Sequence, residues 1–178
     1  MLQSLSTHYA GYCFRSRLEA RWAVFLDHLG VRWEYEPEGF RLSNGLLYLP
    51  DFWLPQVKMW AEVKPNDEVG RLVLTPEAQA KAVGLALGSV RPVLFLDGPP
   101  RDTNYWAIWP EEFDNPLGWY WCDVWLTYPR AYHQAEGRFY ASTGRTFPDH
   151  LPEDEGLWGI HPAVAAARSA RFEHGRQG

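Results

Sequence analysis

The stretch LPDFWLPQVKMWAEVKP, residues 49–65, constrains the fold of this chain more than any other part of the sequence. It contains two short, mostly apolar runs of the kind that form neighbouring strands, and Pro65 ends the second run because proline cannot donate a ladder hydrogen bond. The first run nevertheless carries Asp51, and the second carries Glu62 and Lys64. Each of these charges loses water on burial, so a strand keeps them only for a reason.

Local patterns around this stretch predict a helix followed by three antiparallel strands. Apolar side chains at helical spacing indicate a helix over 14–29. Alternation indicates one strand over 31–36 and another over 57–64. Between them, residues 40–55 predict a hairpin, because the Asn-Gly pair at 44–45 favours the left-handed backbone of a tight turn.

A second helix and a fourth strand are predicted next. Thr75 suits a helix cap and Pro76 the first helical position, with Gly88 as the cap at the far end. Residues 92–96, PVLFL, form a buried strand, and the helical connection makes it parallel to the strand before it. The predicted fold class is therefore α/β, with a helix, a three-stranded antiparallel meander, a crossover helix and a fourth strand.

We expect residues 1–100 to form this core and residues 101–178 to form a C-terminal extension packed on it. Trp and Tyr gather in strand-like runs between 104 and 128, residues 148–156 predict an acidic loop, and a last helix starts near Pro162. Strand aromatics either pack in a core or dimer contact, or stack on exposed bases. The absence of Lys and Arg from these runs favours packing.

Composition narrows the function. The chain has 178 residues and a formal net charge of -5, which argues against coating nucleic acid by bulk charge but allows a local basic patch. Cys13 and Cys122 show neither zinc-type spacing nor a disulfide framework, so we expect a reduced, cytoplasmic setting. No apolar run reaches membrane-spanning length and no segment has the pattern of a signal peptide, so no membrane partner is expected.

The three strand charges suit a metal site. Glu62 and Lys64 lie two residues apart and point to one face of their strand, and Asp51 belongs to the neighbouring strand. Two adjacent carboxylates repel unless a cation lies between them. Such oxygen ligands suit Mg²⁺ or Mn²⁺, which takes one or two carboxylates together with a substrate phosphate. A lysine beside the ion can orient or deprotonate a water and stabilise charge on a phosphate, so the set suits phosphodiester hydrolysis.

Pro50-Asp51, ten intervening residues and Glu62-Val63-Lys64 resemble the signature of the PD-(D/E)XK nuclease superfamily, which includes restriction endonucleases, junction resolvases and recombination exonucleases. Its restriction-endonuclease-like core has the same order of elements as the one predicted above. The stretch YCFRSRLEARWAVFLDHLGVRWEYEPEGF also looks like the front of small, mostly uncharacterised members from bacterial and phage genomes, and the resemblance covers residues 9–97.

The resemblance implies roles by position. Asp51 and Glu62 are the expected metal ligands, with the backbone carbonyl of Val63 beside them, and Lys64 is the expected catalytic lysine. Glu19 matches the acidic residue that many members carry on the first helix. An equally weighted alternative is that Glu19 forms a surface ion pair with the arginine four residues earlier.

Five further side chains are candidates for contact with nucleic acid. Arg15, Arg17 and Arg21 gather on the first helix, where they either contact phosphates or are ordinary solvated charges. Gln79 and Lys81 on the second helix either approach the scissile phosphate or are plain polar residues. Gln79 is not followed four residues later by the Tyr of exonuclease-type members, which counts against an exonuclease.

We therefore expect a Mg²⁺- or Mn²⁺-dependent DNA endonuclease, structure-specific or nicking, since no recognition domain is evident. RNA stays open as a substrate, as does a homodimer. One alternative is a catalytically inactive nuclease-like module that binds DNA or a protein partner. The other is a solvated strand face on which Glu62 and Lys64 form an ordinary ion pair.

Overall fold

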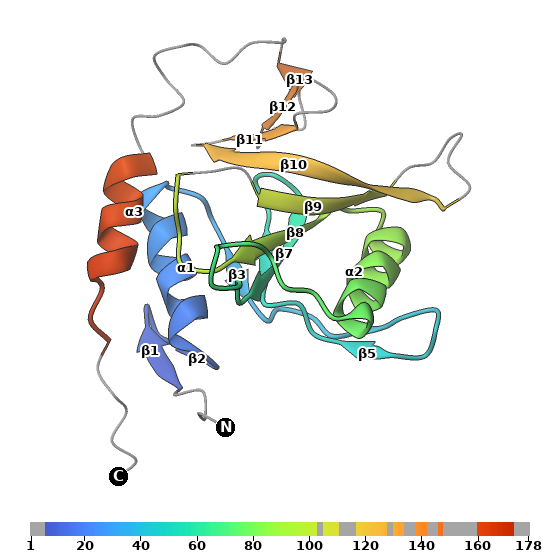
Figure 1. Cartoon of the computed structure of the whole chain (residues 1–178), viewed down its shortest axis with the longest axis horizontal. Helices are drawn as coiled ribbons and strands as arrows, with labels where there is room; N and C mark the ends of the chain where they lie inside the picture. The colour runs from blue at the N-terminus through green and yellow to red at the C-terminus, as the bar shows by residue number, and fades with distance from the viewer. Residues whose placement is uncertain are drawn as a thin grey trace.

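The described part of the protein holds three helices, one large sheet and two small sheets. The computed structural model describes residues 6–102, 105–110, 117–127, 130–133, 138–141, 146–147 and 160–172. The elements are β1 (Thr7–Tyr9), β2 (Tyr12–Phe14), α1 (Arg17–His28), β3 (Glu34–Tyr35), β4 (Phe40–Arg41), β5 (Leu47–Tyr48), β6 (Phe52–Leu54), β7 (Met59–Lys64), α2 (Pro76–Ser89), β8 (Val93–Asp97), β9 (Tyr105–Pro110), β10 (Trp119–Thr127), β11 (Arg130–His133), β12 (Arg138–Ala141), β13 (Thr146–Phe147) and α3 (Ile160–Ser169). The large sheet has the order β13-β12-β11-β10-β9-β8-β7-β6-β3 (Figure 1).

The predicted first helix is present as α1, and caps set both of its ends. The Ser16 hydroxyl accepts a hydrogen bond from the Glu19 amide at the start. At the other end Gly30 takes a positive φ of 67°. The Val31 amide then donates to the Leu26 carbonyl, which is how a glycine closes a helix without strain. The cap at Ser16 explains why α1 begins later than the apolar pattern suggested.

The mixed α/β class predicted from the sequence is confirmed. Strands β3, β6 and β7 are antiparallel neighbours, and β8 adds parallel to β7 after α2. The predicted hairpin at residues 44–45 is present, but it joins β4 to β5 in a separate small sheet. Expecting it inside the main sheet was wrong. Pro37 and Pro50 flank the hairpin, and neither can donate a ladder hydrogen bond that would extend the pairing.

The second helix begins as predicted and ends later. Thr75 caps α2, because its hydroxyl accepts from the Ala78 amide. The prediction that Gly88 ends the helix was wrong, since α2 continues to Ser89. Val90 then closes it with a left-handed φ of 53° and donates its amide to the Ala86 carbonyl. A glycine permits a helix end but does not compel one, as the last carbonyls here find a partner without it.

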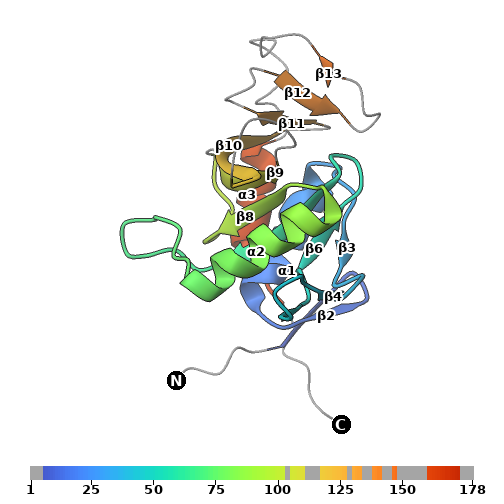
Figure 2. The same cartoon turned by 90° about the vertical axis from the view of Figure 1, so that its right-hand side faces the viewer.

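Each face of the large sheet has its own apolar core, and successive side chains of β7 alternate between the two cores. Helices α1 and α3 cover one face and α2 covers the other (Figures 1 and 2). Met59 and Ala61 belong to the core under α1 and α3, whereas Trp60 belongs to the core under α2. Glu62 and Lys64 continue the row of Trp60, so their side chains lie on the α2 face.

The region after residue 100 continues the same architecture. β9 and β10 extend the large sheet beyond β8, and α3 packs on α1 through Ala163 and Ala167, both fully buried. The predicted last helix is present, starting at Ile160. The predicted acidic loop at 148–156 lies outside the described residues, and the division into 1–100 and 101–178 stays a prediction. No helix among the described residues is both long and apolar enough to span a membrane.

Candidate metal centre and active site

The pairing of β6 with β7 brings the predicted carboxylates together. Phe52 lies opposite Ala61 in this antiparallel pair, so the next position along places Asp51 beside Glu62. Both carboxylates are buried, with 4% of Asp51 and 7% of Glu62 exposed. A short hairpin turn between the two strands therefore accounts for the ten-residue separation of these residues in the sequence.

Asp51 is held by two donors and opposed by two carboxylates. Its Oδ1 accepts from Arg15 Nη2 at 2.5 Å, and its Oδ2 accepts from the Val63 amide at 2.7 Å. Burial, and then the charges of Glu62 and Glu19, raise the pKa of Asp51 to about 8. The guanidinium of Arg15 therefore does not offset the cost of a charge at this position.

Glu62 is tied to two side chains on the α2 face of the sheet. Its Oε1 lies 2.6 Å from Lys64 Nζ, and its Oε2 accepts from the Tyr48 hydroxyl at 2.7 Å. Burial, followed by the charge of Glu62, raises the pKa of Tyr48 well above its ordinary value, so this hydroxyl stays a donor. Lys64 keeps 23% of its side chain exposed and can still meet a ligand from solvent.

Glu19 lies at the start of α1 and is held by several donors. Its carboxylate accepts from the Ser16 hydroxyl at 2.7 Å, from the Tyr35 hydroxyl at 2.6 Å and from the Arg15 amide at 3.1 Å. The guanidinium of Arg15 bonds instead to Asp51 and, at 2.7 Å, to Glu36. Glu19 thus acts on the site through its charge beside Asp51, and it meets Arg15 through the backbone.

Glu62 and Lys64 open into a pocket of about 330 Å³. Its other polar walls include Arg15, Tyr48 and Lys81, and the first turn of α2 completes it. The amino end of a helix carries unpaired amides and a partial positive charge, both of which favour an anion. This pocket therefore offers an anion-binding wall beside a pair of carboxylates.

The nucleic-acid candidates divide between this pocket and the rest of the surface. Arg15 and Lys81 line the pocket, and Lys81 also pairs with Glu77 at 2.6 Å. Gln79 lines a different pocket on the same side of the sheet, described below. Arg17 is exposed and Arg21 is half-buried on α1, and neither lines the first pocket.

Sequence reasoning missed Tyr48, Tyr35 and Glu36 as parts of the site. Tyr48 donates to Glu62 and Tyr35 donates to Glu19. Glu36 forms an ion pair with Arg15, which also binds Asp51. Tyr48 could have been found from its place three residues before Asp51 on the strand leading into it. The other two reach the site only through the pairing of β3 with β6, which the local pattern does not reveal.

The donor set fits a hard divalent cation that keeps open positions. Asp51 pairs with Arg15 and Glu62 pairs with Lys64, and the charges of Glu62 and Glu19 act on Asp51. Within the described ranges, no three His, Cys, Asp or Glu side chains come close enough to form a preformed metal cluster. Asp51 and Glu62 could hold Mg²⁺ or Mn²⁺ as a pair, since these ions keep several waters and take further oxygens from a phosphate.

Comparison with known proteins adds no further constraint on this site. The chain matches no protein-family model, no curated protein and no solved structure.

Proposed function

We propose that this protein is a metal-dependent nuclease of the PD-(D/E)XK type that hydrolyses phosphodiester bonds in DNA. The observation that carries the proposal is the juxtaposition of buried Asp51 with Glu62 and Lys64 on the α2 face, beside a pocket with basic walls. A carboxylate whose pKa is raised to about 8, by burial and then by the charges of other carboxylates, is typical of a functional site.

The proposed roles follow from the contacts. Asp51 and Glu62 would hold Mg²⁺ or Mn²⁺, and the Val63 amide orients Asp51 for this by its hydrogen bond at 2.7 Å. When bound, such an ion supplies Lewis-acid stabilisation of a phosphate and makes water a better nucleophile. Lys64 forms an ion pair with Glu62 and would stabilise charge on the phosphate or orient the attacking water.

The pocket walls would position the substrate. Arg15 is 56% exposed and binds both Asp51 and Glu36, so it can keep Glu36 while it turns toward a phosphate. Lys81 and the amino end of α2 face the same space and favour a second phosphate oxygen. These contacts read the backbone and not the bases, which supports structure-specific or nicking activity over sequence-specific cleavage.

A second candidate function is a nuclease-like module that binds DNA or a protein partner without cleavage. The ion pair of Arg15 with Asp51 favours it, because a guanidinium there partly takes the place of a metal. The raised pKa of Asp51 weighs against it, because the arginine leaves the charge balance of the site incomplete. The active enzyme is therefore the function that we favour, in a cytoplasmic setting and with RNA as an open substrate.

The test is cleavage of supercoiled, linear, single-stranded and branched DNA with Mg²⁺ or Mn²⁺. Wild type is compared with Asp51→Asn and Lys64→Ala, and we expect cleavage by wild type and not by these two site variants. Lys58→Asn is the matched control, since Lys58 is an exposed turn residue with a φ of 54° that asparagine tolerates. Absence of cleavage by wild type on every substrate, or cleavage unchanged by both site variants, overturns the proposal.

A further inference from the structure

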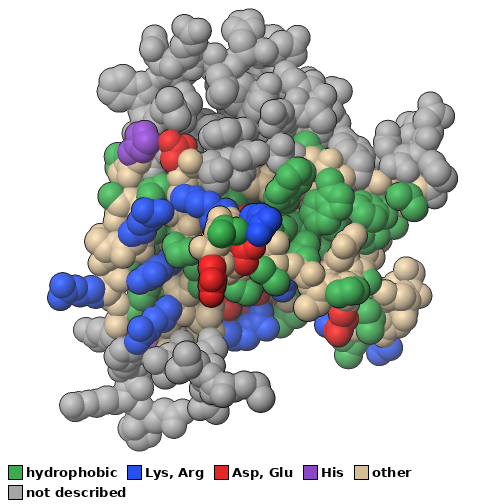
Figure 3. All heavy atoms as spheres, in the orientation of Figure 1, with side chains coloured by type: hydrophobic (Ala, Val, Ile, Leu, Met, Phe, Trp, Pro, Cys, Tyr) green, Lys and Arg blue, Asp and Glu red, His purple; other side chains and the backbone are tan. Residues whose placement is uncertain are grey.

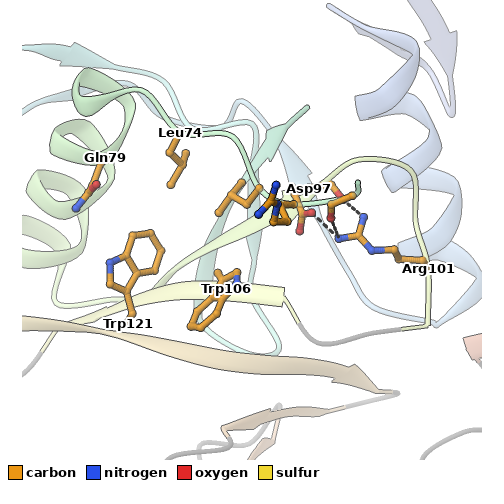
Figure 4. A pocket seen from close by; sticks show the side chains of 9 residues that line it. Leu74, Gln79, Asp97, Arg101, Trp106 and Trp121 are labelled. Atoms are coloured by element: carbon orange, nitrogen blue, oxygen red, sulfur yellow. Dashed lines mark hydrogen bonds and ion pairs between the residues drawn. The ribbon is translucent and has the colours of Figure 1, made fainter. Parts of the chain in front are cut away.

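A second pocket, of about 640 Å³, lies between α2 and the strands β9 and β10. Figure 4 shows Trp106 and Trp121 standing on the two strands, with Leu74 and Gln79 facing them from the side of α2. The ion pair between Asp97 and Arg101 closes one end of the space. The pocket thus combines aromatic and aliphatic walls with an amide and guanidinium groups.

Trp106 is a partly exposed aromatic wall of this pocket. It is 45% exposed, and its ring meets Trp121 edge-on at 6.2 Å. Trp121 is held from behind by Phe95, at 5.6 Å between ring centroids. Figure 3 shows hydrophobic side chains gathered at the surface on this side of the molecule. An exposed indole supported by a fixed second indole is suited to stack on a flat, apolar ligand.

The polar groups of the pocket suit an anion attached to that ligand. Arg71 lines the pocket with 80% of its side chain exposed, and its partner Asp67 is itself only partly buried. An exposed ion pair of this kind is weak and exchanges readily for a phosphate. Gln79 adds an amide that can both donate and accept. A planar ring with a nearby phosphate, as in a nucleotide, matches these walls.

The pocket lies on the same face of the sheet as the candidate active site. Glu62 is in register with Phe95 on β8, and continuing the pairing of Val93 with Ile108 places Trp106 next to Phe95 on β9. Strands lie about 4.8 Å apart, so the backbones at Glu62 and Trp106 are roughly 10 Å apart. Nucleotides are spaced about 3.4 Å along one strand of a duplex, so a few nucleotide steps span this distance.

We propose that this second pocket binds an unpaired base of single-stranded nucleic acid, a few nucleotides from the phosphate held beside Lys64. The base stacks on Trp106, and Arg71 contacts the phosphate next to it. The inference rests on the proposed nuclease function for the position of the strand, but the pocket itself does not require cleavage. It predicts that the protein prefers DNA with a single-stranded or distorted segment.

The test uses full-length protein carrying Lys64→Ala, so that the probe stays intact. Fluorescence anisotropy measures the affinity for a fluorescein-labelled dodecamer of thymidine, and for a dodecamer of the same length made only of abasic units. We expect Trp106→Ala to weaken binding of the thymidine probe about tenfold and to leave the abasic probe unchanged. Trp106→Phe, which keeps a ring, restores most of the affinity.

Tyr12→Ala is the matched control, because Tyr12 is an aromatic residue of similar exposure, 42%, whose ring packs on Phe14 and Trp33 on the other side of the molecule. Equal affinity of Trp106→Ala and its parent for the thymidine probe overturns the inference. So does an equal loss on both probes, which means a backbone contact. A shift from dimer to monomer in Trp106→Ala, without a change in affinity, assigns the pocket to contact between copies and also overturns it.

The two proposals fail separately. If wild type cleaves DNA but Trp106→Ala does not change the affinity for the thymidine probe, the nuclease function is supported and the base-binding pocket is rejected. If wild type cleaves no substrate but Trp106→Ala loses affinity for the thymidine probe, the base-binding pocket is supported and the nuclease function is rejected.

Discussion

Two buried aspartates of the large sheet, one directly before β6 and one at the end of β8, have different electrostatic surroundings. Asp97, 2% exposed, ends β8 in register with Lys64, and its Oδ2 lies 2.5 Å from Arg101 Nη2. Arg101 also donates to the Asp97 backbone carbonyl, so one guanidinium bonds to both the carboxylate and the carbonyl of Asp97. Asp51 is also buried and has an arginine partner, yet burial and then the charges of Glu62 and Glu19 raise its pKa to about 8.

The difference separates a structural ion pair from a candidate site. A buried carboxylate that is paired with its own guanidinium stabilises the local backbone. Removing either partner leaves an uncompensated buried charge. A buried carboxylate that faces other carboxylates is short of positive charge, and a ligand can provide it. We therefore expect Asp97 to matter for stability and Asp51 to matter for function.

The largest predicted effect concerns catalysis. Lys64→Ala and Asp51→Asn should each lower the rate of DNA cleavage by about 10²- to 10⁴-fold, because each removes a charge that acts on the phosphate or its metal. Asp51→Asn should keep the urea midpoint of unfolding or raise it, because it removes a carboxylate that burial and the charges of Glu62 and Glu19 disfavour. Rates are measured by gel with Mn²⁺, and stability by circular dichroism. A loss of stability that accounts for the loss of rate would assign Asp51 to the same class as Asp97.

Breaking the other pair should act on stability instead. Arg101→Ala leaves Asp97 buried without its guanidinium and should lower the free energy of unfolding by about 3 kcal/mol. The control is Arg71→Ala, whose exposed pair with Asp67 should contribute less than about 0.5 kcal/mol. Chemical unfolding in urea measures both. Equal effects for the two arginines would contradict the contrast between a buried and an exposed pair.

The raised pKa of Asp51 predicts a pH dependence of stability in the metal-free protein. Between its ordinary pKa near 4 and its folded pKa of about 8, the native state binds a proton that the unfolded chain does not. Stability should therefore fall as pH rises through this window, by about 2 kcal/mol from pH 6 to pH 8. Asp51→Asn should flatten the dependence, as measured by urea unfolding in EDTA. An equally steep dependence in Asp51→Asn would show that another group titrates.

The smallest effect is expected from the pocket wall. Lys81→Ala should weaken DNA binding about threefold and reduce the salt dependence of binding by about one counterion, because it removes one phosphate contact. Arg17→Ala is the comparison, since Arg17 lies outside the pocket lining and should change affinity less. Anisotropy titrations over a range of salt concentrations measure both. A larger loss of affinity in Arg17→Ala than in Lys81→Ala would indicate that DNA contacts the exposed face of α1.

Much of this arrangement could be predicted from local patterns. The cap at Thr75, the alternation along β7 and the Asn-Gly turn are each encoded within a few residues. Glu62 and Lys64 point to the same face of β7 because side chains alternate between the two faces of a strand. The hairpin was placed in the wrong sheet because a turn fixes the pairing of its own strands and not what they pack against.

The rest depends on register between distant strands. Tyr35 and Glu36 reach the site, and Trp106 meets Trp121, only once β3, β6, β9 and β10 are aligned in the sheet. Arg15 also binds Asp51, 36 residues along the chain, and its place on the predicted first helix does not reveal this contact. Contacts of this range are fixed by packing on both sides of a sheet, which local spacing does not specify.

The central claim is that Asp51 and Glu62 hold a divalent cation, and Mn²⁺ binding tests it without reference to activity. Titration of the protein with Mn²⁺, followed by the electron paramagnetic resonance signal of the free ion, should show binding at pH 8 that weakens at pH 6, where a proton competes at Asp51. Asp51→Asn and Glu62→Gln should abolish it, and Asp67→Asn, at an exposed carboxylate, should not. Absence of Mn²⁺ binding by wild type at millimolar concentration, or binding unchanged in Asp51→Asn and Glu62→Gln, would contradict the account.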